Sequence, residues 1–383
     1  MDRERLDRLL RLGFEKGASD IHFQVGYLPL YRFNGELVEL RYKVLTPADT
    51  ESLARLLVEA DDSKIPFEDR TEMDLAYEIP GEGRFRVNIS RERRSYNVVL
   101  RVIPIEIKDF ESLNLPSVLR EIADVRRGLV LVTGATGMGK STTLATMLQE
   151  INCARKCKII TIEDPVEFIF KHERAIITQR EIGTDSPNFP TALHAALRQD
   201  PDVIMVGEIR DAETVDTALK AAETGHAVFS SIHTSDVATT LRRVPSFFNT
   251  EEQAQVRDRL AENIEAIVSL RLLPNKKGTG RVPAVEIMRI TRSIRECIRD
   301  SSRSHEVHDH IEKGRELMKM QTFDQHVLDL YQAGKIRLET AREAASNPRD
   351  FSTKLTLEGD ADEIGDMNTE SEDAVDVAED ERF

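Results

Sequence analysis

A glycine-rich loop that joins an apolar run to a helix-like run places the strongest limit on the fold of this chain. The loop, residues 134–141, has the sequence GATGMGKS and fits the pattern G-x-x-x-x-G-K-S/T. The run 128–133 before it is apolar and strand-like, and the residues after it have the character of a helix. A chance match to the pattern is rare, and one between a strand and a helix is rarer still. The loop therefore indicates a nucleotide-binding α/β domain rather than an ordinary glycine-rich turn.

The loop also predicts roles for individual residues. Its glycines let backbone N–H groups approach phosphate oxygens, and the following helix presents its positive end to the same anion. We expect Lys140 to reach the β- and γ-phosphates of ATP, and Ser141, with Thr142 as a second candidate, to offer a hydroxyl to Mg²⁺. The expected nucleotide contacts in this region are Gly134, Thr136, Gly137, Gly139, Lys140, Ser141 and Thr142.

Charge is unevenly distributed along the 383 residues. The formal net charge is -15, but residues 358–383 contain twelve acidic residues and one basic residue, so they carry -11 and the remainder -4. Residues 352–383 are expected to be a solvated, disordered tail, because residues 358–383 contain few of the large apolar residues that drive collapse. No apolar run approaches the ~18 to 20 residues of a membrane span, so the chain is expected to be cytoplasmic. Cys153, Cys157 and Cys297 form no C-x-x-C pair and no four-ligand zinc set, and are expected to be reduced thiols.

The order of strand-like and helix-like segments predicts two folded domains of the α/β class. Residues 1–108 are expected to form a small mixed sheet flanked by helices, and the charged residues 109–117 to be a linker. In residues 118–290, short apolar runs alternate with helical stretches, which is typical of a doubly wound parallel sheet covered on both faces. Residues 291–351 show helical patterns alone.

Two acidic residues follow apolar runs in the second domain. Glu163 comes directly after the run 158–162, and Glu208 follows the run 203–206 after one glycine. Ligands of open α/β sheets bind at the carboxyl ends of the strands. Nucleotide hydrolysis also needs a group that orients water and a group that supports the metal. Either acid alone is readily explained as a solvated loop residue, but the two beside a phosphate loop indicate a catalytic pair.

His226 and His233 flank the apolar run 227–232. A lone histidine is more often structural than functional, and no third metal ligand is evident for this pair. We therefore interpret both histidines as polar sensors of the phosphate rather than as zinc ligands.

Together these segments resemble the signature segments of the secretion ATPases that power type II secretion and type IV pili. They are the phosphate loop, the acidic box EDP at 163–165, LRQDPD at 197–202 leading into VGEIRD at 206–211, and the two-histidine box at 224–234. ASDIH at 18–22 and GRFRVN at 83–88 resemble the N-terminal domain of that family. The resemblance covers residues 1–351. It implies a PAS-like α+β domain, then a RecA-like P-loop ATPase core and a C-terminal helical region.

Two features make the chain more similar to the pilus retraction branch of that family. Assembly and secretion members usually carry a four-cysteine zinc insertion, and this chain has three cysteines in total. The retraction branch has a short helix of the form AIRNLIRE, and SIRECIRD at 293–300 resembles it, with identity at four of the eight positions: Ile294, Arg295, Ile298 and Arg299. The chain departs from the family at His194, where an arginine is frequent, and at Ser293 and Glu296 in this helix. The acidic tail is a further departure, and with it the chain resembles accessory retraction paralogues as much as the principal motor.

The resemblance implies roles that residue spacing does not. Glu163 is expected to act as general base on the attacking water, and Glu208 to act through the metal. Arg86 and Arg101 of the first domain are expected to reach the nucleotide as the domains close, some such arginines completing a neighbouring subunit's site. Arg210 is expected to contact the nucleotide from the core. Sites completed in this way require a ring, and relatives form homohexamers.

The implied function is a Mg²⁺-dependent hexameric ATPase that drives type IV pilus retraction. Its expected location is cytoplasmic and peripheral at the inner membrane, and its expected partners are a membrane platform protein and a paralogous pilus ATPase. Arg295 and Arg299 give helix 293–300 a basic edge suited to docking, beside an apolar edge of Ile294 and Ile298 that ordinary packing explains equally well.

Three alternatives remain open at this point. One is a pilus assembly or type II secretion ATPase of the same family. Another is a ring-shaped nucleic-acid motor, which is disfavoured because aromatic content is 5% and no basic stripe with aromatic residues is visible. A regulator that binds nucleotide without hydrolysing it is the third.

Overall fold

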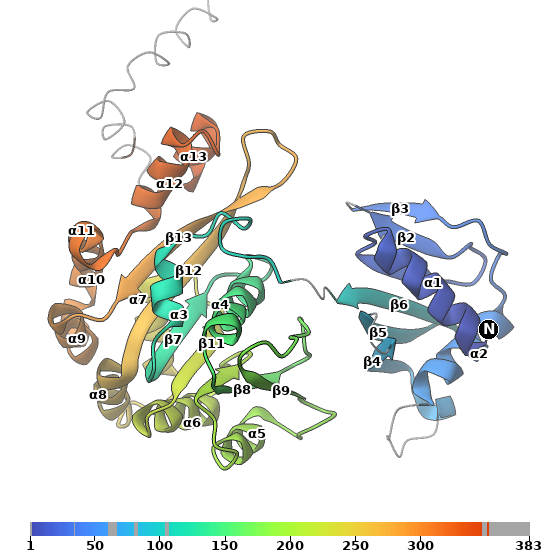
Figure 1. Ribbon diagram of the computed structural model, residues 1–383, viewed down its shortest axis with the longest axis horizontal. Helices are drawn as coiled ribbons and strands as arrows, with labels where there is room; N and C mark the ends of the chain where they lie inside the picture. The colour runs from blue at the N-terminus through green and yellow to red at the C-terminus, as the bar shows by residue number, and fades with distance from the viewer. Residues whose placement is uncertain are drawn as a thin grey trace, which may run out of the picture.

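The computed structural model describes residues 2–33, 35–59, 67–79, 83–103, 107–346 and 351. They form two domains, each built on one sheet (Figure 1). The first sheet has the strand order β3-β2-β1-β6-β5-β4, and the second has the order β13-β12-β7-β11-β10-β8-β9. The α/β class predicted from the sequence is confirmed. The predicted disordered tail 352–383 lies outside the described residues.

In the first domain, helices lie over one face of an antiparallel sheet. Alternate residues of the long strands are buried, as expected for a sheet with one covered face. The second helix begins at a capping box, in which Thr46 and Asp49 each accept a hydrogen bond from the other's backbone N–H. The elements are α1 (Arg3–Glu15), β1 (Asp20–Phe23), β2 (Leu30–Phe33), β3 (Glu36–Glu39), α2 (Pro47–Val58), η1 (Phe67–Asp69), β4 (Glu72–Ile79), β5 (Gly83–Glu92) and β6 (Ser95–Ile103).

The second domain alternates strands and helices. Its elements are α3 (Val118–Ala123), β7 (Gly128–Thr133), α4 (Lys140–Ala154), β8 (Lys158–Glu163), β9 (Ile176–Glu181), α5 (Phe189–Ala196), β10 (Val203–Val206), α6 (Ala212–Glu223), β11 (Ala227–Ile232), α7 (Val237–Ser246), α8 (Gln253–Asn263), β12 (Ile264–Pro274) and β13 (Arg281–Arg289). Strands β9, β12 and β13 were not predicted from the sequence. The strands from β9 to β12 in the sheet order are parallel, and β13 pairs antiparallel with β12.

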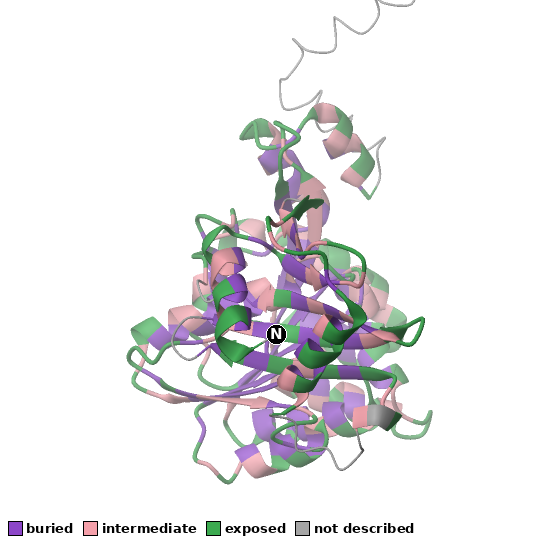
Figure 2. Cartoon of the chain, turned by 90° about the vertical axis from the view of Figure 1, so that its right-hand side faces the viewer, coloured by how far each residue is buried: buried purple, intermediate pink, exposed green. Residues whose placement is uncertain are grey.

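Both faces of this second sheet are covered. In β7, Leu129 and Leu131 pack into the core on the side of α5 to α8, whereas Val130 and Val132 pack into the core with α3 and α4. Every residue of β7, β10 and β11 is buried, and Figure 2 shows buried residues concentrated along the sheet. The sheet therefore holds its strands, and the loops at their carboxyl ends, in a rigid frame.

Residues 291–346 contain helices and no named strand within the described part of the chain. They are α9 (Arg292–Arg299), η2 (Ser301–Glu306), α10 (Val307–Lys313), α11 (Arg315–Met318), α12 (Phe323–Gln332) and α13 (Leu338–Ala344). Helices α9 and α10 extend the core on the side of α8, while α12 and α13 form a smaller core with Val282 and Ala284 of β13. Among the described residues, no helix combines the length and apolar character that crossing a bilayer demands.

The segment predicted to be a linker is partly packed against the second domain. Phe110 and Leu115 are buried in the same core as Leu144 and Leu148 of α4. The hydroxyl of Thr146 in α4 also donates a hydrogen bond of 2.9 Å to the backbone oxygen of Lys108. The entry to the second domain is therefore fixed to the helix that follows the phosphate loop.

Candidate functional site

The phosphate loop lies between β7 and α4, as predicted. Gly137 and Gly139 have φ angles of 79° and 88°, the left-handed region that glycine adopts without strain. Helix α4 begins at Lys140, whose Nζ donates hydrogen bonds to the backbone oxygens of Gly134 (2.9 Å) and Ala135 (3.1 Å). Burial lowers the pKa of Lys140. The loop thus presents a partly desolvated ammonium beside the start of a helix, an arrangement suited to phosphate oxygens.

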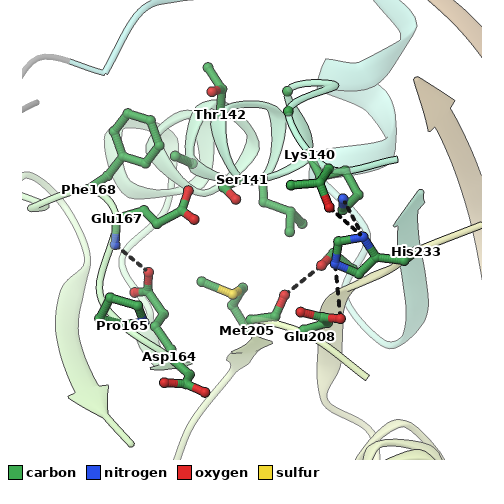
Figure 3. A pocket seen from close by; sticks show the side chains of 18 of the residues that line it. Lys140, Ser141, Thr142, Asp164, Pro165, Glu167, Phe168, Met205, Glu208 and His233 are labelled. Atoms are coloured by element: carbon green, nitrogen blue, oxygen red, sulfur yellow. Dashed lines mark hydrogen bonds and ion pairs between the residues drawn. The ribbon is translucent and has the colours of Figure 1, made fainter. Parts of the chain in front are cut away.

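A cavity of about 690 Å³ opens in front of this loop. Its volume lies in the range of ligand pockets, roughly 300 to 1,000 Å³. Figure 3 shows Lys140, Ser141 and Thr142 on one side of it, with Glu167 and Glu208 facing the same space. The predicted residues that line it are Arg86, Arg101, Thr136, Gly137, Gly139, Lys140, Ser141, Thr142, Glu163, Glu208, Arg210 and His233.

Glu163, the last residue of β8, is buried with 7% of its surface exposed. One carboxylate oxygen accepts hydrogen bonds from Thr161 Oγ1 (2.7 Å) and Gln179 Nε2 (3.2 Å), and the other accepts from the N–H of Glu167 (3.3 Å). Burial raises the pKa of Glu163, although these hydrogen bonds oppose the shift. A buried carboxylate with a raised pKa at the edge of a phosphate cavity suits proton abstraction from water.

Glu208 lies after β10 and is held from two sides. His233 Nε2 is 3.0 Å from one carboxylate oxygen, and Arg210 Nη2 is 2.8 Å from the other. Burial by itself would raise the pKa of Glu208, but Arg210 and His233 outweigh it and the net pKa is lowered. Nδ1 of His233 is also 3.4 Å from Lys140 Nζ and 3.5 Å from Thr136 Oγ1. His233 therefore connects the phosphate loop to an ionised carboxylate.

His226 is not placed at this cavity. It precedes the amino end of β11, whereas His233 follows the carboxyl end of the same strand, and His226 does not line the cavity. Its Nδ1 is instead 2.9 Å from the backbone oxygen of Ala221 at the end of α6. The structure therefore does not bring His226 to the cavity together with His233, because the six-residue strand β11 lies between them.

The first domain contributes two arginines, Arg86 and Arg101, to the lining of the cavity. Arg101 Nε donates a 2.9 Å hydrogen bond to Asp20 Oδ1, whereas the guanidinium of Arg86 has no hydrogen bond or ion pair among the described residues. A third arginine of the same sheet, Arg84, was not predicted. It donates a 2.6 Å hydrogen bond to Glu181 at the end of β9, so it bridges the two domains.

Several other lining residues were missed from the sequence. Arg281 and Leu272 reach the cavity from the β12–β13 hairpin, and Phe168 and Phe170 reach it from the segment after Glu163. The motifs contained no signal for the hairpin residues. Arg281 could have been recognised only by predicting the β12–β13 hairpin and the position of β12 beside β7.

The basic edge predicted for α9 is directed at α8. Arg295 Nε donates a 2.9 Å hydrogen bond to the backbone oxygen of Ala261, and Arg299 pairs with Glu262 and Asp258. Glu296, which departs from the family pattern, lies 3.3 Å from Arg303. The two arginines therefore have intramolecular partners, in addition to any role in docking.

Comparison with known proteins identifies the family. Residues 4–355 match the family described as "Type II/IV secretion system protein". The chain belongs to this family. It is 41% identical over 348 residues to "Type IV pilus retractation ATPase PilT" of Pseudomonas aeruginosa, covering 90% of this chain and 99% of that protein. It is 38% identical over 363 residues to "Type IV pilus ATPase PilU" of the same organism, covering 94% of each.

A solved structure supports the same assignment. The fold is similar to the "Crystal Structure of the Pilus Retraction Motor PilT and Bound ADP", with a TM-score of 0.80 and 42% identity over 90% of this chain and 98% of that chain. The resemblance and the two-domain fold inferred from the sequence are thereby confirmed. As a member of the type II/IV secretion family with an intact phosphate loop, the chain is an ATPase. The roles of the individual site residues remain predictions.

Proposed function

We propose that this ATPase is a type IV pilus retraction motor. The observation that carries the proposal is one cavity that collects the phosphate loop, Glu163, Glu208 and the first-domain residues Arg86 and Arg101. A site lined by both domains couples what occupies it to the position of one domain relative to the other. The proposal is also supported by similarity to a protein named a pilus retraction ATPase over almost its whole length.

Each residue has a distinct part in the proposed hydrolysis of ATP. Glu163 accepts the proton of the attacking water and holds it at a carboxylate oxygen, and its hydrogen bond from Thr161 fixes its direction. Lys140 balances negative charge on the β- and γ-phosphates. Arg86 and Arg101 bind the phosphate end of the nucleotide as the first domain closes, which excludes water from the cavity.

The residues present fit Mg²⁺, which prefers oxygen ligands. The hydroxyl of Ser141 and the carboxylate of Glu208 would hold it, partly through water, and the ion would supply positive charge against the phosphate oxygens. Glu208 is suited to this because its pKa is lowered by Arg210 and His233 against the effect of burial.

The proposed assembly is a homohexameric ring. First-domain arginines that complete a neighbouring subunit's site need a closed heterologous interface, and a ring provides it. Successive hydrolysis around the ring would turn or pull a platform protein of the inner membrane, at which the motor is a peripheral cytoplasmic component. A paralogous pilus ATPase is a further expected partner.

An assembly or secretion ATPase is the nearest alternative, but three cysteines cannot form the four-cysteine zinc insertion of that branch. A strain without the gene, complemented with the wild-type chain or with Glu163→Gln, separates the two. Retraction predicts excess surface pili in the deletion strain and in the Glu163→Gln strain, and normal numbers with the wild type. A deletion strain without surface pili would contradict retraction, and strand unwinding by the purified ring would indicate a nucleic-acid motor instead.

A further inference from the structure

Three side chains of the C-terminal helical region bring together a thiol, a carboxylate and an imidazole. Cys297 lies on the buried face of α9, Glu306 ends η2, and His310 follows one turn later in α10. One ligand atom from each lies within 4.8 Å of the other two. Figure 1 shows α9 and α10 as neighbours at the side of the sheet away from the first domain. The cluster is therefore separate from the nucleotide cavity.

His310 carries a polar atom that the fold leaves without a hydrogen bond. Its Nε2 is shielded from solvent and has no hydrogen-bond partner among the described residues. Oε2 of Glu306 lies 3.8 Å from it, too far for a hydrogen bond. A shielded nitrogen of this kind costs free energy unless something binds it. A cation between His310 and Glu306 would bind both atoms.

We propose that Cys297, Glu306 and His310 form a binding site for one Zn²⁺ ion. Zinc bond lengths and tetrahedral angles place neighbouring ligand atoms about 3.3 to 3.6 Å apart. The Glu306–His310 distance of 3.8 Å is already close to this spacing. The side chains of Glu306 and His310 are 32% and 30% exposed, so both have room to close on Cys297. Water completes the fourth position.

The donor set selects the type of metal. Thiolate and imidazole favour zinc and similar transition metals, whereas Mg²⁺ requires oxygen ligands. The Mg²⁺ that accompanies a nucleotide therefore does not fill this site. Burial raises the pKa of the Cys297 thiol, so zinc binds by displacing the thiol proton, which leaves to solvent.

Arg303 competes with the proposed ion for the carboxylate of Glu306. Its Nε and Nη2 donate to the two carboxylate oxygens of Glu306 at 2.9 and 2.8 Å. Its Nη1 is also 3.3 Å from Oε2 of Glu296. When zinc takes one oxygen of Glu306, Arg303 keeps a partner in Glu296. Removal of the Arg303 charge should therefore strengthen metal binding.

Occupancy would join α9 to α10 through Cys297 on one helix and His310 on the other. Helix α9 carries Arg295 and Arg299, both bound to α8. The ion would thus stabilise the packing of α9 independently of the nucleotide cavity.

The test is a metal titration of the tag-free, full-length wild-type protein without nucleotide. Co²⁺ should bind at one ion per chain with a thiolate-to-cobalt absorption band, and Zn²⁺ should displace it while excess Mg²⁺ does not. Cys297→Ser should abolish the band. His310→Gln and Glu306→Gln should weaken binding by at least about tenfold, the lower bound for losing only an outer-shell partner. Arg303→Gln should strengthen binding.

Two variants serve as matched controls. Cys153→Ser removes an exposed thiol on α4, and His308→Asn removes a half-exposed imidazole from the same helix as His310; neither should change the band. The proposal is overturned if no band forms, if the band persists in Cys297→Ser, or if the affinity is unchanged in His310→Gln. Because the His310 side chain is partly exposed, His310→Gln tests the site even if Cys297→Ser does not fold.

Discussion

Arg84 of the first domain and Glu181 of the second form an ion pair, with Nη2 2.6 Å from Oε2. Both side chains are largely buried, with 18% and 9% exposed. The same oxygen of Glu181 accepts a hydrogen bond of 3.1 Å from the N–H of Val166. Val166 lies three residues after Glu163, so the contact between the domains also holds the segment that follows the proposed general base.

Arg84→Ala should slow ATP turnover without preventing ATP binding. The change leaves the Glu181 carboxylate without its cation and loosens the segment after Glu163, and a shift of about 1 Å in a catalytic group costs up to roughly a hundredfold in rate. We expect kcat to fall about tenfold or more in steady-state assays. Arg84→Lys should restore part of the rate. Turnover in Arg84→Ala equal to that of the wild type would show that the pair has no part in positioning Glu163.

The acid side of the turnover profile should depend on Thr161. Burial raises the pKa of Glu163, so the base is protonated, and turnover lost, as pH falls through a value above that of an ordinary glutamate. Thr161→Val removes a hydrogen bond that favours the charged carboxylate, which should raise this pKa further. The acid limb of kcat against pH should therefore move to higher pH in Thr161→Val and stay in place in Thr161→Ser. Identical acid limbs in all three proteins would contradict the assignment of Glu163.

Glu286 should make the folded protein less stable as pH rises. This buried residue of β13 accepts a 2.8 Å hydrogen bond from the N–H of Val237, and burial raises its pKa to about 7. The folded state then holds a proton that the unfolded state releases, so stability is lost between about pH 4.5 and 7, by roughly 2 to 3 kcal/mol. Glu286→Gln keeps an acceptor for Val237 but does not titrate.

Denaturant unfolding at pH 5 and pH 8 measures the effect. The stability of Glu286→Gln relative to wild type should increase from pH 5 to pH 8, while the exposed control Glu251→Gln should show no such change. A constant difference between Glu286→Gln and wild type across this range would contradict the raised pKa.

Arg295→Ala combined with Arg299→Ala should separate hydrolysis from retraction. These arginines lie outside the nucleotide cavity, so ATP turnover should be largely retained, while retraction measured by twitching motility should be lost if they dock the platform protein. The loss of their contacts with α8 should lower stability, because the ion pairs of Arg299 contribute about 0.2 to 1 kcal/mol and the hydrogen bond from Arg295 to Ala261 about 0.5 to 1.5 kcal/mol.

A double variant of the acidic α8 residues that pair with Arg299 is the control for the two arginine substitutions. Asp258→Asn with Glu262→Gln removes the acids that pair with Arg299 but leaves both arginines in place. Retraction should survive in this variant if the arginines act on a partner. Loss of retraction in both variants, or loss of ATP turnover with it, would indicate that the α8–α9 contact alone is required.

The strands at the centre of the second sheet were predictable because burial on both faces leaves a continuous apolar run. β7, β10 and β11 consist of such runs. β9 was missed because it lies at the sheet edge and begins with Ile176, which is 65% exposed. β12 and β13 were missed although they are largely buried, since their apolar residues are interrupted by Arg271, Pro283 and Glu286.

The site residues that belong to sequence motifs could be predicted, and the others could not. Lys140, Glu163, Glu208 and His233 meet at one cavity because the carboxyl ends of parallel strands share one edge of the sheet. His226 precedes β11, so the same rule places it at the opposite edge of the sheet from the cavity. The pairing of Arg84 could not be predicted from the sequence. Its partner Glu181 is almost a hundred positions away, and the contact depends on how the two domains are placed.

The hydrogen bond from Thr146 to Lys108 and the buried side chain of Phe110 attach the start of the second domain to α4. From the end of β6 at Ile103 to this fixed point, the backbone spans at most about 18 Å even when fully extended. The first domain is thus tethered to α4 at Thr146, near the middle of that helix. In the proposed motor, this tether would restrict closure of the first domain over the cavity to a rotation about α4.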